Sequence, residues 1–157
     1  MKVFLIYDSK YGNTKLAAQQ IAAGLKESGG NNIELCYVKE TDAKKLADFD
    51  ALIFGAPNHM GGPSRTMSKF IDSLEKVQIR AKWAAVFDTY FAKPKNYGKA
   101  MKKMEKKLNE KFPNLKIIVS GLSVKVEGVN GPIAGGELSK SKEFGTAIGK
   151  QLRNLTS

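Results

Sequence analysis

The residues best suited to bind a charged ligand lie between Ser9 and Thr14. An apolar, β-prone run over residues 3–7 ends in this short polar segment, and a helical pattern of apolar residues begins directly after it. A strand, a tight turn and a helix N-terminus in that order aim backbone N–H groups and the positive end of the helix dipole at one point. Side-chain donors are offered by Ser9, Asn13 and Thr14, while Gly12 lets the backbone approach a ligand without an intervening Cβ. The segment therefore predicts an anion-binding site.

The spacing of these residues excludes two common classes of phosphate site. Neither the nucleoside-triphosphate pattern G-x-x-x-x-G-K-S/T nor the dinucleotide pattern G-x-G-x-x-G occurs here. A turn rich in hydroxyl groups suits a terminal phosphate monoester, because each of its several oxygens needs a donor. An ordinary strand-to-helix turn with a threonine cap is the alternative.

This segment resembles the mononucleotide-phosphate motif of the flavodoxin family. The motif runs aliphatic, aliphatic, aromatic, any residue, Ser or Thr, two residues, Gly, one residue and Thr, with Ala four residues further on. This chain matches it with Leu5, Ile6, Tyr7, Ser9, Gly12, Thr14, Ala18 and also Ile21. The resemblance implies FMN as the cofactor, with its phosphate held by a turn that comprises Ser9, Lys10, Tyr11, Gly12, Asn13 and Thr14.

A second loop of the implied site has the sequence FGAPNHMGGPS and follows the third apolar run. The resemblance assigns flavin contact there to Pro57, Asn58, His59, Met60, Gly61 and Gly62. In flavodoxins a peptide of this loop turns its carbonyl toward the protonated central-ring nitrogen of the reduced flavin, which implies the same use for Met60–Gly61 or Gly61–Gly62. The glycines supply the freedom for such a flip, and a turn that only reverses the chain is the alternative. His59 either acts on the flavin as a donor or a charge, or is an exposed loop residue without a role.

The third implied loop ends the fourth apolar run and contributes Asp88, Thr89, Tyr90 and Phe91. The ring of Tyr90 or of Phe91 is predicted to stack on the isoalloxazine, since offset aromatic pairs are favourable. Packing of these rings on the following helix is the alternative. The loop departs from the family's usual Gly-Asp segment and later Tyr and Cys, and the sequence does not choose between the two aromatic residues. As a polar residue, Asp88 is expected on the ligand side of the sheet.

Five apolar runs position these loops, at residues 3–7, 33–38, 51–55, 83–87 and 115–119. Helical patterns alternate with them: a short, weak one near residues 42–49 and a clear one that starts after Pro63 and Ser64. Two later helices are predicted from apolar stripes, which comprise Met101, Met104, Leu108 and Phe112 in one and Phe144, Ile148 and Leu152 in the other. This alternation predicts an α/β fold in which helices cover both faces of a parallel sheet. We expect one domain over residues 1–157, a flavodoxin-like three-layer sandwich with the five-stranded order 2-1-3-4-5. That order places a ligand at the switch between strands one and three, a rule for which flavodoxin is itself the standard example. The irregular, glycine-rich residues 121–136 are predicted to border the flavin ring or the docking surface.

The composition of the chain indicates its cellular compartment and the kinds of ligand and partner that it can bind. Cys36 is the only cysteine and excludes an internal disulfide, and with His59 as the only histidine no metal site is expected. No apolar stretch has membrane-spanning length and no signal peptide is recognisable, so a cytoplasmic monomer without membrane insertion is predicted. The formal net charge is +11, and residues 91–125 hold ten lysines and two glutamates. Such a charge could attract nucleic acid, acidic lipid or an acidic protein, but charge that comes almost entirely from lysine argues against specific nucleic-acid readout. A solvated, lysine-rich helix face without a partner is the alternative.

Three classes of function are compatible with these residues. The first, favoured because the chain has no insertion for a nicotinamide site, is an FMN-binding electron carrier between redox proteins. An electron carrier needs no catalytic side chain, and the basic charge of this chain predicts partners with an acidic docking surface. The second is an NAD(P)H-dependent FMN quinone or flavin reductase. The third is a partner-binding module without redox activity, which the intact phosphate motif disfavours. The second loop also resembles the flavodoxin module of flavo-diiron proteins and, less closely, quinone-reducing relatives.

Overall fold

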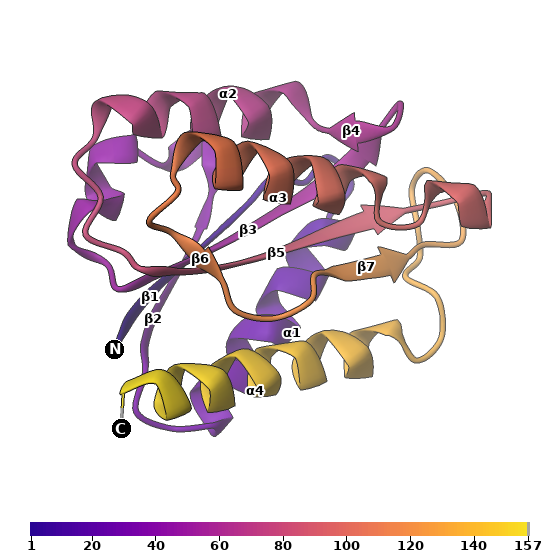
Figure 1. Cartoon of the computed structure of the whole chain (residues 1–157). Coiled ribbons are helices and arrows are strands. Elements are labelled where there is room, and N and C mark those ends of the chain that lie inside the picture. Colours follow the sequence, from indigo (N-terminus) through magenta and orange to yellow (C-terminus); the bar gives the residue numbers. More distant parts are fainter. Residues whose placement is uncertain (157) are drawn as a thin grey trace.

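A computed structural model describes residues 1–156, and the apolar runs of the sequence form one parallel sheet between two helical layers (Figure 1). In chain order the elements are β1 (Lys2–Tyr7), α1 (Asn13–Glu27), β2 (Asn32–Tyr37), η1 (Val38–Glu40), η2 (Ala43–Asp48), β3 (Ala51–His59), β4 (Gly62–Pro63), α2 (Arg65–Ser73), η3 (Leu74–Lys76), β5 (Trp83–Tyr90), η4 (Pro94–Asn96), α3 (Lys99–Lys111), β6 (Lys116–Ile117), β7 (Leu122–Lys125) and α4 (Glu137–Thr156).

The parallel strands run in the order β2-β1-β3-β5-β6, and β7 also pairs with β5. This confirms the predicted order 2-1-3-4-5. The register pairs Tyr7 of β1 with Gly55 of β3, and Pro57 of β3 with Thr89 of β5. The carboxyl ends of these three strands therefore meet at one edge of the sheet, where the predicted loops emerge.

The fifth strand position differs from the single run expected at residues 115–119, because two short strands fill it. Ala84 pairs with Ile117 in β6, whereas Phe87 pairs with Leu122 in β7. Between these pairs β5 advances by three residues and its neighbour by five, so two extra residues interrupt the ladder. Gly121 ends the interruption, where a Cβ would lie 2.2 Å from Met101 Sδ. The stretch that looked irregular thus begins with a strand that continues the sheet.

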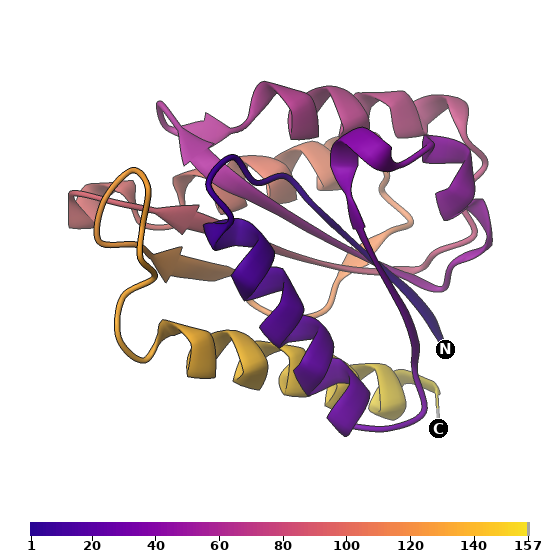
Figure 2. The same cartoon turned by 180° about the vertical axis from the view of Figure 1, so that it is seen from behind.

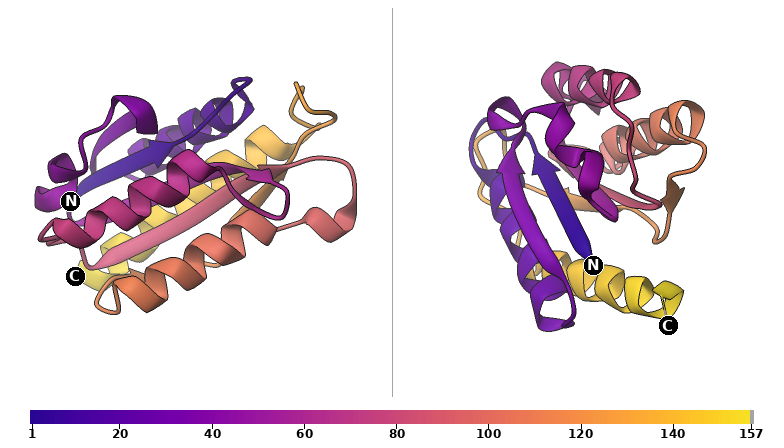
Figure 3. Two further views of the ribbon diagram at one scale, coloured as in Figure 1. Left: turned by 90° about the horizontal axis from the view of Figure 1, so that it is seen from above. Right: turned by 90° about the vertical axis from the view of Figure 1, so that its left-hand side faces the viewer.

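Helices α2 and α3 cover one face of the sheet, and α1 and α4 cover the other (Figures 1 and 3). Two buried clusters correspond to these layers, one containing the apolar sides of α2 and α3 and the other those of α1 and α4. The backbones of α1 and α4 approach closely, since a Cβ on Gly24 would lie 2.0 Å from the carbonyl oxygen of Lys142. Close contact between these helices therefore requires the glycine.

The helices follow the predicted apolar patterns, with one difference in type. Ser64 caps α2 by accepting a hydrogen bond from the Met67 N–H at 3.3 Å, as its position before an apolar pattern predicts. The apolar residues predicted for α3 and α4 are buried or, for Phe112, packed against the core. The weak pattern near residues 42–49 forms only the 3₁₀ helix η2, capped by Asp42.

Candidate functional site

The turn between β1 and α1 is fixed by the side chain of Ser9. Its Oγ accepts hydrogen bonds from the N–H of Gly12 at 3.0 Å and, more weakly, from that of Lys15 at 3.4 Å. As the N-cap residue of α1, Gly12 has φ +92°, in the left-handed region that favours glycine. No heavy atom lies within 4 Å of where its Cβ would be. Glycine is thus required here by backbone conformation and not by crowding.

The first turn of α1 presents backbone donors that lack acceptors. Within residues 1–156, no hydrogen bond engages the N–H groups of Tyr11, Asn13 and Thr14. The N-cap residue Gly12 offers no side-chain cap, Ser9 reaches only the Lys15 N–H of this turn, and the turn has no acidic residue. The threonine cap considered from the sequence is absent. Buried backbone donors are nearly always paired, and Thr14 is buried. This donor set fits an anion with several acceptor oxygens.

A pair of hydroxyl groups links this turn to the neighbouring strand. Thr14 Oγ1 and Thr89 Oγ1 are 2.9 Å apart, and both residues are buried. Because each hydroxyl offers one donor and two acceptor positions, Thr14 can accept from Thr89 and donate to a ligand. The sequence predicted both residues as site residues but gave no reason to expect that they touch.

The loop after β3 forms a hairpin. Asn58 pairs with Pro63 and His59 with Gly62, so Met60 and Gly61 form a two-residue turn with φ +52° and +86°. Positive φ at both positions is the type I′ geometry, which is unusual for methionine. The loop therefore reverses the chain, as one of the two alternatives requires, and the carbonyl flip toward a flavin stays a prediction.

Asn58 ties this hairpin to the third loop. The Asn58 Oδ1 accepts from the Gly61 N–H at 3.0 Å, and its Nδ2 donates to the carbonyl oxygen of Asn96 at 3.2 Å. Asn96 Nδ2 in turn donates to the carbonyl oxygen of Phe91 at 3.2 Å. The second and third loops are thus one hydrogen-bonded unit, a role for Asn58 that the sequence did not predict.

The aromatic residues at the end of β5 have different surroundings. Tyr90 makes an edge-to-face contact with Tyr97, with ring centroids 5.6 Å apart. Burial raises the pKa of the Tyr90 hydroxyl, with a smaller contribution from Glu137. Phe91 is exposed, as is Tyr11 of the first loop. Tyr90 therefore makes the ring packing considered as its alternative, though with Tyr97 and not with a helix, while Phe91 leaves much of its ring free.

Asp88 lies beneath the site and not on its surface, unlike the loop position expected for it. Its side chain is fully buried, and Oδ1 accepts from Ser123 Oγ at 2.5 Å while Oδ2 accepts from the Met101 N–H at 2.9 Å. Burial raises its pKa to about 6, although these hydrogen bonds act in the opposite direction. Side chains alternate along a strand, so Asp88 points to α3 whereas Thr89 points to α1.

The three loops emerge side by side at the carboxyl edge of the sheet (Figure 2). Together with part of the 121–136 segment they line a small cavity. Its lining residues are Ser9, Lys10, Tyr11, Asn13, Thr14, Pro57, Asn58, His59, Thr89, Tyr90, Phe91, Val126 and Val129. Eleven of the sixteen predicted site residues are among them, while Gly12, Met60, Gly61, Gly62 and Asp88 lie outside the lining. The cavity volume is about 80 Å³, well below the roughly 300–1,000 Å³ of pockets that enclose a drug-sized ligand.

Val126 and Val129 were not predicted individually. They belong to residues 121–136, the segment expected to border the ring, and the Val126 N–H donates to the Tyr90 carbonyl at 2.8 Å. The same segment reaches the first loop, since a Cβ on Gly131 would lie 2.5 Å from Asn13 Oδ1. The signal available in the sequence was the position of the segment after the last strand, which could not identify the residues.

A strand order of 2-1-3-4-5 defines the flavodoxin-like class of doubly wound α/β proteins, and in this chain the helix after the first strand has an open N-terminus. A family profile described as "Flavodoxin domain" matches residues 4–123. This is most of the chain, which therefore belongs to the flavodoxin family. Proteins of this family bind FMN, and the donor set at the start of α1 fits the phosphate of that cofactor.

Individual relatives agree with this family. A protein named flavodoxin from Clostridium saccharobutylicum is 33% identical over 89 residues, which cover 57% of this chain and 56% of that protein. The match thus spans just over half the length of this relative. The oxidised flavodoxin 1 of Bacillus cereus has a TM-score of 0.79 at 25% identity, with complete coverage of both chains. The flavodiiron core of Flv1 from Synechocystis scores 0.78 at 21% identity, covering 99% of this chain and 36% of that one.

Residues 1–156 contain no group of three or more histidine, cysteine, aspartate or glutamate side chains arranged to hold a metal ion. None of the helices in the same range combines the length and apolar character needed to cross a membrane.

Proposed function

We propose that this chain is an FMN-binding electron-transfer protein that carries electrons between redox proteins. The proposal depends chiefly on one observation, the unbonded N–H groups of Tyr11, Asn13 and Thr14 at the start of α1. A phosphate monoester would provide their acceptors, and the helix dipole would favour its charge. The bound flavin supplies one- and two-electron redox chemistry, while the protein binds it, orients it and controls its exposure.

Three sets of residues are proposed to hold the cofactor. The phosphate is assigned to the first loop, with Ser9, Lys10, Tyr11, Gly12, Asn13 and Thr14. The ring system is assigned to the other two loops, with Pro57, Asn58, His59, Met60, Gly61, Gly62, Thr89, Tyr90, Phe91, Val126 and Val129. Asp88 is assigned a different part, holding α3 against the end of β5 from below. The carbonyl flip of the Met60–Gly61 or the Gly61–Gly62 peptide remains a prediction, and so does a role of His59 as a donor or a charge toward the flavin.

The small cavity favours a carrier over an NAD(P)H-dependent FMN quinone or flavin reductase. A reductase of that kind must stack a nicotinamide against the flavin, which needs a second site beside the first. A cavity of about 80 Å³ leaves a ligand as large as FMN only partly enclosed. Exposure of this kind suits electron transfer across a protein surface, and no catalytic side chain is required for it.

The partners are proposed to be redox proteins with acidic docking surfaces, because the chain carries a formal net charge of +11. We further propose that the chain acts as a monomer in the cytoplasm, as one domain over residues 1–157. Partner docking driven by charge is slowed by added salt, since the Debye length falls from about 30 Å at 0.01 M to about 8 Å at 0.15 M.

The test is the visible spectrum of the purified protein with FMN, followed by addition of NADH or NADPH. A carrier shows a bound-flavin spectrum that is stable to both nicotinamides until a separate reductase is added. Rapid bleaching at catalytic protein concentrations would establish the reductase instead. A protein that stays colourless in excess FMN and gives no heat of binding by calorimetry would overturn both.

A further inference from the structure

The lysines of α3 divide into two groups. Three lysines nearer its C-terminus pair with carboxylates: Lys106 with Glu110 at 4.0 Å, and Lys107 and Lys111 with Asp72 of α2 at 2.9 and 3.2 Å. Lys111 also pairs with Glu75. Nearer its N-terminus, and in the segment before it, five exposed lysines have no carboxylate within 4.0 Å in residues 1–156. We name them the basic flank: Lys93, Lys95, Lys99, Lys102 and Lys103.

The basic flank lies beside the mouth of the cavity. A Cβ on Gly61 would be 3.8 Å from Lys99 Cδ, and one on Gly62 would be 3.5 Å from Lys103 Cδ. The stems of these two lysines thus pass close to the β3–β4 hairpin, whose first strand lines the cavity. Lys93 and Lys95 follow Phe91, another lining residue, within four positions.

Few acids oppose this charge locally. Asp88 is buried below the start of α3, where its oxygens are used by Ser123 and the helix backbone. Glu105 is partly buried near Lys102, and burial raises the pKa of its carboxyl group. The exposed charges that η4 and the start of α3 place beside the cavity are therefore positive, while Glu127 is exposed in another segment, between the lining residues Val126 and Val129.

Large apolar side chains are exposed around the same mouth. They are Tyr11, Met60, Phe91, Tyr97 and Val129, contributed by four separate loops. Met60 is fully exposed at the tip of the hairpin, and its φ of +52° is unfavourable for a residue with a side chain. An apolar centre enriched in aromatic residues and methionine, with a charged rim, is the usual composition of a protein–protein interface.

We propose that the cavity mouth and the basic flank together form the docking surface for an acidic redox protein, oriented with its carboxylates over η4, the start of α3 and the β3–β4 hairpin. The inference rests on the proposed function and adds the location and the direction of approach. A protein partner is favoured over a nucleic acid or a membrane because the apolar side chains surround the cofactor cavity, through which electrons must pass. The lysines lie on one side of it and do not trace a groove.

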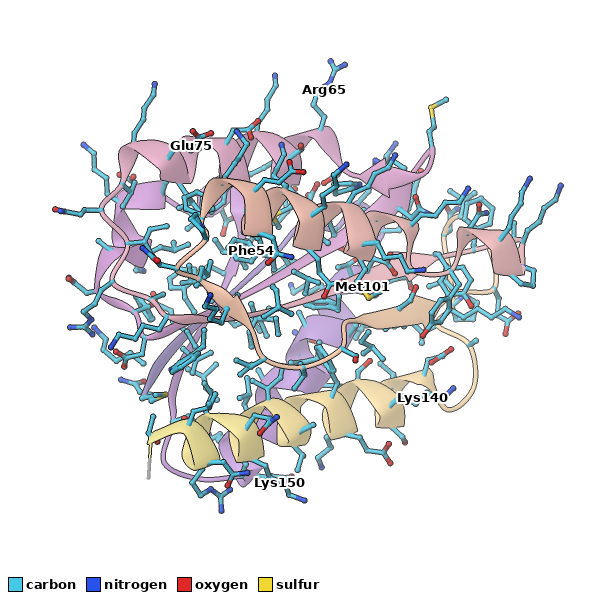
Figure 4. All side chains as sticks on the ribbon, in the orientation of Figure 1. Phe54, Arg65, Glu75, Met101, Lys140 and Lys150 are labelled. Carbon is cyan, nitrogen blue, oxygen red and sulfur yellow. The ribbon has the colours of Figure 1, made fainter. Side chains whose placement is uncertain are left out.

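The experiment measures reoxidation of the reduced FMN-loaded protein by two small oxidants of opposite charge, ferricyanide and hexaammineruthenium(III). The fully reduced flavin gives up two electrons, one to each of two oxidant molecules, and the proton that it releases on oxidation passes to solvent. The test variant is Lys99→Glu/Lys103→Glu. The control, Lys116→Glu/Lys150→Glu, changes the net charge equally at sites away from the cavity. Lys116 pairs with Trp83 at the opposite edge of the sheet, and Lys150 lies on α4 (Figure 4).

In the wild type, added salt is expected to slow the reaction with ferricyanide and to accelerate the reaction with hexaammineruthenium(III). Lys99→Glu/Lys103→Glu is expected to slow ferricyanide by about tenfold at low salt, at the lower end of typical steering effects. The control is expected to change either rate by less than about twofold, because remote exposed charges are screened. Equal effects of the two double variants would overturn the proposal.

A second measurement uses a protein reductant, an acidic ferredoxin in its reduced state, which passes one electron at a time to the oxidised FMN-loaded protein and to the same variants. The docking surface predicts a salt-sensitive rate that falls in Lys99→Glu/Lys103→Glu and is retained in the control. No salt dependence with ferredoxin, together with tight binding to oligothymidine or phosphatidylserine vesicles at 0.15 M salt, would overturn the choice of an acidic protein.

The failure of this inference can be told apart from failure of the proposed function. Each variant is first titrated with FMN by fluorescence quenching, so a loss of cofactor binding is seen directly. The neutral variant Lys99→Gln/Lys103→Gln provides a folded comparison if charge reversal disturbs α3. Unchanged FMN affinity with unchanged oxidant preference would reject the docking surface while leaving the electron carrier intact.

Discussion

Two helices of this protein, α1 and α3, begin in the same way and have different partners. Each has a left-handed glycine as its N-cap residue, Gly12 at φ +92° and Gly98 at φ +71°, without a side-chain cap from that residue. Neither has an acidic residue in its first turn. A helix N-terminus of this kind has unpaired N–H groups and attracts negative charge. The difference lies in whether the rest of the chain supplies an acceptor.

At α3 the acceptor is internal. Asp88 accepts from the Met101 N–H, and Ser123, which donates to Asp88, accepts from the Gly98 N–H at 2.9 Å. At α1 the corresponding side chain of the same strand is Thr89, one residue later and on the opposite face of the sheet. β5 therefore gives one helix a carboxylate and the other a hydroxyl. The comparison teaches that an anion site needs a neighbouring strand without an acid as well as a free helix terminus.

The most direct way to break the comparison is Thr89→Asp, which gives α1 its own carboxylate. A charge facing Thr14 would occupy the free donors and repel phosphate, and like charges brought together cost several kcal/mol. We expect FMN affinity to fall by more than about 100-fold, measured by flavin fluorescence quenching.

Thr89→Asn is the matched control for this prediction, because it has the same size without the charge. It should weaken FMN binding by less than about tenfold, and riboflavin should bind equally to both variants. Equal losses of FMN affinity in the two variants would show that shape, and not charge, matters at this position.

The complementary change, Asp88→Asn, removes the internal acid from α3. Because burial raises the pKa of Asp88 to about 6, its favourable contribution to stability is complete below pH 4 and is lost as the pH rises to about 6. The free energy of unfolding of the wild type relative to Asp88→Asn should therefore fall by about 2 kcal/mol between pH 4 and pH 7. Urea denaturation of the apoprotein across this range measures the difference. A difference that stays constant with pH would show that folding does not raise the pKa of Asp88.

The sequence predicted most of the fold because its signals were local. Apolar runs of strand length and the apolar stripes of the helices required no knowledge of distant contacts. The strand order, in contrast, was taken from the flavodoxin-like fold that this alternation fits. The interruption between β6 and β7 was missed, since it depends on how Gly121 packs against Met101. The 3₁₀ form of residues 43–48 was also missed, because its weak pattern gave no preference between helix types.

The sequence located the loops of the candidate site more readily than it assigned a contact to each residue in them. The phosphate motif located the first loop, and parallel topology brought the ends of β3 and β5 beside it. The side of β5 on which Asp88 and Thr89 lie follows from alternation only once the helices have been assigned to faces. The contact of Asn58 with Asn96 joins loops 38 positions apart, and no local pattern indicates it.

Thr14→Val sharpens the comparison from the α1 side. It removes a hydroxyl that is 2.9 Å from Thr89 Oγ1 and is proposed to donate to phosphate. A lost hydrogen bond to a charged group weakens FMN binding by about 1–3 kcal/mol, measured by isothermal calorimetry. Riboflavin, which lacks the phosphate, should bind almost as before. An equal loss for riboflavin would mean that Thr14 supports the cavity and not the phosphate.

The smallest expected effect comes from replacing the two N-cap glycines separately by alanine. Left-handed φ costs an L-residue about 1–2 kcal/mol, so Gly12→Ala and Gly98→Ala should lower the free energy of unfolding by similar amounts. Gly98→Ala adds a tight contact, because its Cβ would lie 3.2 Å from Met101 Cε, whereas Gly12→Ala meets nothing within 4 Å. Only Gly12→Ala should also lower FMN affinity, since only α1 is left open to an external anion. Equal FMN affinity in the two variants would mean that the difference between the two helix termini has no bearing on cofactor binding.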